Sequence, residues 1–269
     1  MQLARSRKVV LLGVVLLGAG LAGRASADTT TNHQAAAPPS ASSSVPARPP
    51  AKKPPVSKKT ATPVSAKTGP AGSRMTTGSK AVALTFDDGP DPAQTPRILK
   101  LLAQQHIHAT FCLVGKNAQK HPELVRAIVA AGHTLCNHTW SHSLTLGKQS
   151  PAAMKADLQR TRNAILTAAP KAKLKYFRAP GGNFTPALVG TAKQLGMSSI
   201  YWKVDPRDWY HPKGETHAQH QRRVIYRVSH NTRSGAIVLS HDFGQPDTIV
   251  AYRKIIPTLK KKYQLVALP

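Results

Sequence analysis

Short apolar runs alternate with helix-like stretches along the carboxyl-terminal two thirds of the chain. The runs have the length and flanking turn residues of buried β-strands, and they cover residues 81–86, 109–114, 133–137, 175–178, 198–204, 236–240 and 264–268. Buried strands that alternate with helices are typical of a parallel sheet. Seven such units in about 190 residues predict an α/β domain built as a distorted (β/α) barrel with about seven parallel strands. A doubly wound open sheet is the alternative.

Proline marks the expected helix starts. Four pairs place Pro where the first helical residue would lie: Thr95-Pro96, His121-Pro122, Ser150-Pro151 and Thr185-Pro186. In three of them the preceding Thr or Ser is a good capping residue. Gly132 and Gly196 fit helix ends.

The first residues have the composition of a secretion signal. A basic start precedes an apolar run over residues 9–22, too short for a comfortable membrane span, and residues 25–27 form a small-residue cleavage site. We predict a signal peptide at residues 1–27 and a secreted, extracellular or cell-wall-associated protein with no stable membrane span after cleavage. A retained membrane anchor is the alternative.

A proline-rich segment follows the signal. Residues 28–80 hold nine prolines and no Leu, Ile, Phe, Trp or Tyr, so they cannot bury a core. We predict a disordered linker of extended geometry. Its eight Lys and Arg residues would attract anionic wall polymers weakly, and a merely solvated spacer is the alternative.

The predicted domain, residues 81–269, is strongly basic. It contains 26 basic and ten acidic residues, a formal net charge of +16. An exported chain without a recognisable nucleic-acid motif meets anionic cell-wall polymers first, so we exclude nucleic acid as its partner. Four of the ten acids form two clusters, Asp87 with Asp88 and Asp205 with Asp208. A role in surface solubility would scatter them.

Two histidines four residues apart, His138 and His142, follow the third predicted strand, and Asp87 and Asp88 follow the first. Imidazoles at positions i and i+4 of a helical turn share a face, and one carboxylate completes a three-ligand metal site with an open position for water. The second acid is then free for proton transfer. A chance pair is the alternative, because the chain contains twelve histidines.

Further polar residues follow other predicted strands. Arg178 ends the fourth strand, Asp205 and Asp208 follow the fifth, and His241 follows the sixth. The carboxyl ends of parallel strands converge on one rim of a barrel, where active sites form. We therefore predict a metal-dependent hydrolase site at this rim.

Five ordered motifs resemble those of the polysaccharide deacetylases of the NodB-homology type, carbohydrate esterase family 4, over essentially all of residues 81–269. They are TFDDG (85–89), HTWSH (138–142), RAPGG (178–182), DPRDW (205–209) and LSH (239–241). Each motif is weak alone, whereas the ordered set is specific. The resemblance implies a distorted (β/α) barrel, one divalent metal that we expect to be zinc, and removal of acetyl groups from acetylated glycans.

The resemblance also implies roles for the metal and proton-transfer residues. Asp88, His138 and His142 would bind the metal, which acts as a Lewis acid on the acetyl carbonyl and lowers the pKa of its bound water. Asp87 would be the general base, held in place by Arg178.

On the opposite side, the resemblance makes His241 the acid that protonates the leaving amine. Asp208 would raise the pKa of His241 and fix its ring. The backbone N–H of Gly181 would stabilise the oxyanion, and Trp209 and Leu239 would wall the substrate pocket. Many members of the family have an aromatic residue where Gly181 stands, which predicts a wider or differently shaped pocket here.

Other readings of these residues stay open. Asp208 and Asp205 could be turn residues, and Asp205 is left out of the catalytic set for this reason. Arg178 could be an interior ion-pair partner, and Trp209 could be plain core packing. The remaining histidines considered are expected at surface or satisfied core positions: His106, His108, His121 and His133 in or beside helices, and His211, His217 and His220 in a polar loop.

The two cysteines of the chain, Cys112 and Cys136, fall in successive predicted strands. Export permits a disulfide, but adjacent parallel strands do not guarantee the required Cα separation, so two buried thiols are equally compatible. Neither cysteine has a predicted base beside it, so neither is a candidate nucleophile.

Three functions are compatible with these features. The first is deacetylation of N-acetylglucosamine, or of N-acetylmuramic acid, in peptidoglycan by a monomeric enzyme. The second is the same chemistry on another polymer, as a chitin or chitooligosaccharide deacetylase or an acetylxylan esterase. The third, of another class, is a non-catalytic cationic protein that binds the cell wall.

Overall fold

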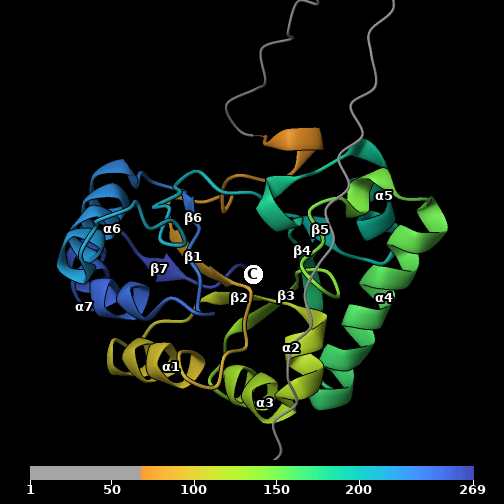
Figure 1. Cartoon of the computed structure of the whole chain (residues 1–269), viewed down its shortest axis with the longest axis horizontal. Helices are drawn as coiled ribbons and strands as arrows, with labels where there is room; N and C mark the ends of the chain where they lie inside the picture. Colours follow the sequence, from red (N-terminus) through yellow and green to blue (C-terminus); the bar gives the residue numbers. More distant parts are fainter. Residues whose placement is uncertain (1–67) are drawn as a thin grey trace, which may run out of the picture. The chain divides into compact units, whose positions relative to one another are not determined.

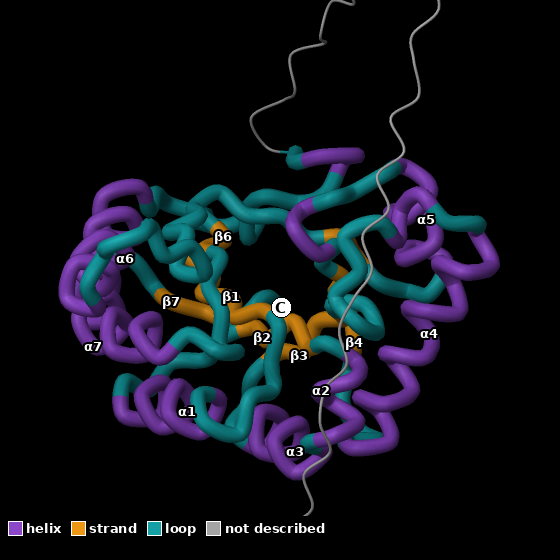
Figure 2. The backbone as a smooth tube through the Cα atoms, in the orientation of Figure 1, coloured by secondary structure: helices purple, strands orange, loops and turns teal. Residues whose placement is uncertain are grey.

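Seven parallel strands form one curled sheet with helices around its outside (Figure 1, Figure 2). The computed structural model describes residues 68–269. The strands are β1 (Val82–Asp87), β2 (Thr110–Leu113), β3 (Thr134–Asn137), β4 (Leu174–Phe177), β5 (Ser198–Ser199), β6 (Ile237–Val238) and β7 (Leu265–Val266). Their order is β5-β4-β3-β2-β1-β6, and β7 also pairs with β1. The prediction of a distorted (β/α) barrel is confirmed.

The barrel is incomplete between β5 and β6. The segment before β1 forms two isolated bridges beside this gap, Arg74 to Ile200 and Thr76 to Ala236. A third bridge joins Val204 to Val238. The run expected as one strand over residues 198–204 therefore forms a ladder only at β5. Residues 68–80 were expected to belong to the linker, but Arg74 and Thr76 bridge to residues adjoining β5 and β6, so the folded domain begins before Ala81.

Seven α-helices occur within residues 68–269. They are α1 (Thr95–Gln104), α2 (Gly115–Lys120), α3 (Pro122–Ala130), α4 (Pro151–Ala168), α5 (Pro186–Gln194), α6 (His217–Asn231) and α7 (Pro246–Lys260). The proline pairs mark four of these starts, and the side chains of Ser150 and Thr185 cap α4 and α5 as predicted. Thr95 differs, because it lies inside α1 after Gln94. Three short 3-10 turns, Pro70–Gly72, Leu146–Lys148 and Pro180–Gly182, complete the elements.

Strand β1 is buried along its whole length because helices cover one face and the barrel interior the other. Phe86 packs toward the helices, against Phe111 and Tyr252. Residues of the opposite parity pack in a second cluster, which contains both cysteines. Cys112 and Cys136 are register partners on β2 and β3, 4.1 Å apart at Cα, and form a disulfide. The sequence leaves open whether these cysteines are bonded, and their position as register partners on neighbouring strands brings them close enough for the disulfide.

The predicted signal peptide (1–27) and the linker up to residue 67 lie outside the described residues. Within residues 68–269, none of the helices has the length and apolar character needed to cross a membrane.

Candidate active site

The three predicted metal ligands meet at the carboxyl end of the sheet. The Nε2 atoms of His138 and His142 each lie 3.3 Å from Oδ1 of Asp88. Residues 138–142 form an irregular turn and not the helical turn that the spacing suggested; Thr139 and His142 adopt positive φ angles of 65° and 57°. Asp88 has φ 75°. The ligands converge through these left-handed backbone positions, which helical geometry would not supply.

Neighbouring groups orient these three side chains in a way that suits a cation. The carbonyl of Arg178 lies 2.8 Å from Nδ1 of His138, which fixes the ring with Nε2 toward Asp88. Oδ1 of Asp88 is buried and has no hydrogen-bond partner within residues 68–269. An orphaned buried carboxylate oxygen between two imidazole nitrogens fits a divalent metal, because each of the three groups can donate an electron pair.

The electrostatics of the triad favour an ionised carboxylate. Burial alone would raise the pKa of Asp88, but the adjacent imidazoles, His138 first among them, hold that pKa well below its usual range. For His138, burial would lower the pKa, and the charge of Asp87 together with Asp88 raises it instead. For half-buried His142, the effect of burial exceeds that of the Asp88 charge and lowers the pKa. The lowered pKa favours the neutral ring, which is the form that binds metals.

The second acid of the pair, Asp87, is held by a buried arginine. Nη1 of Arg178 donates to Oδ1 of Asp87 at 2.7 Å and to Oγ1 of Thr85 at 2.8 Å, and Nη2 donates to the carbonyl of Tyr201. Oδ2 of Asp87 lies 3.7 Å from Nε2 of His138. Arg178 is therefore an interior ion-pair partner that also orients the carboxylate beside the candidate metal site.

A histidine–aspartate pair lies on the other side of the site. Nδ1 of His241 is 2.8 Å from Oδ1 of Asp208, and Oδ2 accepts from the backbone N–H of His241 and from the hydroxyl of Thr248. Burial would lower the pKa of His241, but the Asp208 carboxylate outweighs burial and raises it to about 10. Asp208 does lie in a turn, and its side chain is fully buried.

A pocket of about 400 Å³ joins both sides, lined by Asp87, Asp88, His138, His142, Leu144, Gly181, Trp202, Asp205, Trp209, Leu239 and His241. Trp209 is 49% exposed, which argues against plain core packing. A side chain at position 181 would project toward Leu144, 3.0 Å away. Leu144 therefore lines the pocket beside Gly181, which has no side chain that could do so.

Several residues of the site were not predicted from the sequence. Trp202 and Leu144 line the pocket, Thr248 holds Asp208, and Asp157 on α4 accepts from the backbone N–H of Trp140 at 2.8 Å. No recognisable motif contains them. Asp205 lines the pocket and also closes a turn, because its Oδ1 accepts from the backbone N–H of Arg207.

Asp242, next to His241, is also buried. Burial raises its pKa to about 7, and its Oδ2 accepts from the hydroxyl of Thr95. This buried acid therefore connects the strand-end site to α1.

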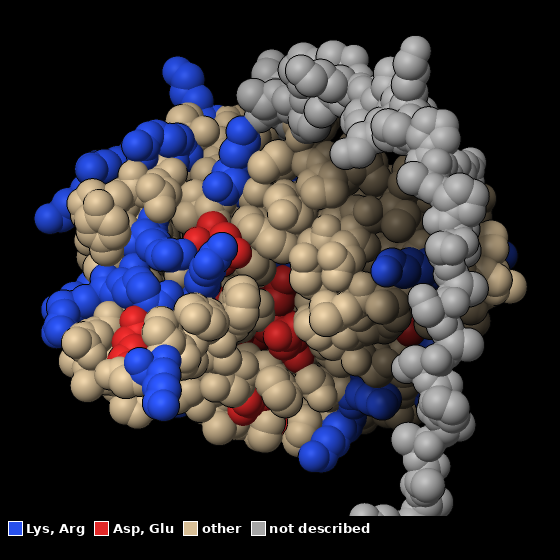
Figure 3. Space-filling model, turned by 45° about the horizontal axis from the view of Figure 1, so that its top comes forward, with Lys and Arg blue, Asp and Glu red and all other residues tan. Residues whose placement is uncertain are grey.

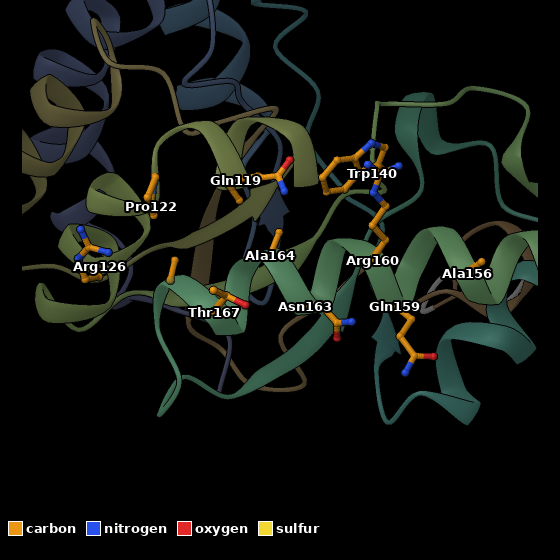
Figure 4. A pocket seen from close by; sticks show the side chains of 12 residues that line it. Gln119, Pro122, Arg126, Trp140, Ala156, Gln159, Arg160, Asn163, Ala164 and Thr167 are labelled. Atoms are coloured by element: carbon orange, nitrogen blue, oxygen red, sulfur yellow. The ribbon is translucent and has the colours of Figure 1, made fainter.

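A larger cavity, about 690 Å³, lies away from the strand ends (Figure 4). It is lined by residues of α2, α3 and α4 together with Trp140, whose ring is covered by the guanidinium of Arg160 at 3.8 Å. The lining contains no Asp, Glu or His, so it offers no group for acid–base or metal chemistry.

Charge is distributed unevenly over the described residues. On the face shown in Figure 3, some acidic side chains lie in a central hollow and others lie outside it, while basic side chains are densest on the side of α6 and α7. An anionic polymer would be attracted to this basic side.

Comparisons with known proteins agree with this geometry. A family profile described as polysaccharide deacetylase matches residues 74–200. A chitooligosaccharide deacetylase from Bradyrhizobium sp. is 35% identical over 206 residues, 71% of this chain and 90% of the relative. A peptidoglycan-N-acetylglucosamine deacetylase from Bacillus cereus is 37% identical over 187 residues, 68% of this chain and 83% of the relative.

A solved structure extends the likeness to three dimensions. A peptidoglycan N-acetylglucosamine deacetylase in complex with 4-naphthalen-1-yl-N-oxidanyl-benzamide superposes with a TM-score of 0.65 at 34% identity. The match covers 72% of this chain and 89% of that chain.

Proposed function

The chain belongs to the polysaccharide deacetylase family, carbohydrate esterase family 4, and on this premise we propose that it is a secreted, metal-dependent enzyme that removes acetyl groups from peptidoglycan N-acetylglucosamine. The observation that carries the proposal is the juxtaposition of an Asp-His-His triad with an arginine-held carboxylate and a buried histidine–aspartate pair around one pocket. N-Acetylmuramic acid is a further candidate substrate within the same polymer.

Asp88, His138 and His142 would hold the cation, for which zinc is proposed because two imidazoles and a carboxylate suit it. When bound, the cation supplies Lewis-acid polarisation of the acetyl carbonyl and lowers the pKa of a coordinated water. The lowered pKa of His142 and the ionised state of Asp88 both leave their lone pairs available for this role.

Two proton transfers are carried out by residues on opposite sides of the pocket. Asp87, restrained by Arg178, accepts the proton of the attacking water. His241 is protonated at neutral pH because Asp208 raises its pKa, and it delivers a proton to the leaving amine. The backbone N–H of Gly181 stabilises the oxyanion. Trp209 and Leu239 wall the sugar and acetyl positions.

The basic surface supports a location at the cell wall. Exposed or half-exposed cations of α6, α7 and their flanking residues are Arg222, Arg227, Arg233, Arg253, Lys254, Lys260, Lys261 and Lys262. The two acids between residues 217 and 262, Asp242 and Asp247, are both buried. This surface complements anionic wall polymers, and the basic segment before residue 68 would add to it.

Two other functions remain as alternatives. Chitooligosaccharide is favoured by the name of the Bradyrhizobium relative, and acetylxylan would use the same chemistry. A purely wall-binding protein would need none of the paired acid and base groups that line the pocket.

A substrate panel with one variant separates these functions. Wild-type protein is expected to release acetate fastest from peptidoglycan, compared with chitooligosaccharide and acetylxylan. Asp87→Asn should lose roughly 10²–10⁴-fold in rate because the proton acceptor is gone. It should still bind walls, because the basic surface is unchanged. Equal rates for variant and wild type would support the wall-binding alternative.

A further inference from the structure

A second group of metal-binding side chains lies between the segment after Asp208 and helices α6 and α7. One ligand atom each of His211, Glu215 and His220 lies within 4.8 Å of the others. The rings of His211 and His220 have centroids 3.9 Å apart. The prediction that His217 and His220 belong to a polar loop is wrong, because both lie in the first turn of α6.

His220 has the surroundings of a metal ligand. Its side chain is fully buried, and Nδ1 lies 3.1 Å from Oδ2 of Asp247 on α7. Its Nε2 is buried and has no hydrogen-bond partner within residues 68–269. A carboxylate on one ring nitrogen fixes the tautomer and leaves the other nitrogen as an electron-pair donor, which is the usual arrangement around metal-bound histidine. An unpaired buried nitrogen is otherwise costly.

The other two members can complete the site. Glu215 is paired with Arg223, whose Nε and Nη2 donate to its two carboxylate oxygens at 2.7 and 2.8 Å. Each carboxylate oxygen retains a further lone pair, so Arg223 positions the group without using its full capacity. His211 is exposed and contacts Gln245 at 3.2 Å through Nε2, so it can turn toward a cation at little cost.

We propose that His211, Glu215 and His220 form a second divalent-metal site, distinct from the pocket, that ties the segment after Asp208 to α6, and through the contact of His220 with Asp247 to α7. Two imidazoles and one carboxylate select a zinc-class cation over magnesium or calcium, which prefer oxygen ligands. The three protein ligands leave a fourth position for water.

The location gives this site a structural role. Helices α6 and α7 pack side by side (Figure 1). Asp208 and Trp209 immediately precede the segment that carries His211, and Thr248, next to Asp247, holds Asp208. A cation bound here would restrain the residues that orient His241 and wall the pocket.

The test is the zinc stoichiometry of the full chain, dialysed against Zn²⁺ at a low, chelator-buffered free concentration. Wild-type protein is expected to retain two equivalents. The double variant Asp88→Asn/His142→Ala should retain one, held by the second site, and adding His211→Ala should remove it. One equivalent in the wild type together with none in the double variant would overturn the proposal.

Matched variants assign the ligands. His211→Ala is chosen because His211 is exposed, and His217→Ala is its control. His217 also contacts Asp247 but does not belong to the ligand group, and its side chain is 82% exposed. In the Asp88→Asn/His142→Ala background, Zn²⁺ about 100-fold above Kd should raise Tm by roughly 5–10 °C. This rise should persist with His217→Ala and disappear with His211→Ala. Loss of the rise with His217→Ala alone, or its persistence with His211→Ala, would overturn the ligand assignment.

Discussion

Two buried acids on opposite sides of the pocket have different charged neighbours, and the proposed mechanism gives a proton acceptor, Asp87, to one side and a proton donor, His241, to the other. Asp87 is held by the cation Arg178. Asp208 is paired with His241, whose pKa it raises to about 10. Both acids are buried, so their carboxylates interact with these protein groups and not with bulk water.

The Asp208–His241 pair makes a pH prediction. His241 must be protonated to act as an acid, so activity should fall as pH rises through its pKa. Asp208→Asn removes the charge that raises this pKa, and burial then lowers it. The alkaline limb of the kcat/KM profile should therefore move to lower pH by at least about one unit. Thr248→Val, which keeps the Asp208 carboxylate, should move the alkaline limb less. An unmoved limb in Asp208→Asn would show that His241 is not the acid.

Residues in contiguous motifs at strand ends could be predicted from the sequence, and their spatial neighbours could not. The positions of Asp87, Asp88, His138 and His241 follow from parallel strands ending at one rim. Leu144 and Thr248 reach the site through packing between distant segments, and the sequence carries no pattern for such contacts. For His220 the expected polar loop was wrong, because it lies on α6, and its contact with Asp247 was not predicted for the same reason.

Among the helices, α4 supports the turn that carries the candidate metal ligands His138 and His142. Asp157 accepts from the backbone N–H of Trp140, and Arg160 stacks on the Trp140 ring. Both contacts fix a turn whose left-handed residues would otherwise relax.

Removing this support should weaken metal binding. Asp157→Ala leaves the Trp140 N–H without its acceptor, and we expect a fall in metal affinity of about tenfold or more, as for other groups that orient metal ligands. Competition with a chromogenic chelator measures it. Asp157→Asn keeps an acceptor oxygen and should retain most of the affinity. Wild-type affinity in Asp157→Ala would mean that the turn is held by other contacts.

The apolar runs predicted the existence and positions along the chain of all seven strands, because buried strands need continuous apolar side chains. They overestimated β5 and β6, since a hydrophobic residue such as Val204 can be buried by an isolated bridge without a ladder. They also missed residues 74–76, because one apolar residue, Met75, gives no strand signal, although Arg74 and Thr76 form bridges to Ile200 and Ala236.

Over the whole described domain, basic side chains are concentrated on the side of α6 and α7, while some of the acids lie in a central hollow. Binding to isolated anionic wall polymer should weaken between 0.1 and 1 M salt, because the Debye length shortens from about 10 to 3 Å. Arg253→Gln/Lys254→Gln should reduce binding at low salt more than Lys171→Gln/Lys173→Gln, which removes the same charge elsewhere. Sedimentation with polymer measures both effects. Binding that does not respond to salt would exclude this electrostatic mode.

Acetate release by metal-stripped protein shows whether the reaction needs a cation at Asp88, His138 and His142. Protein dialysed against chelator should lose its activity on peptidoglycan and regain it when Zn²⁺ is returned, whereas Asp88→Asn should not recover. Undiminished acetate release by wild-type protein shown to contain no metal would contradict the account.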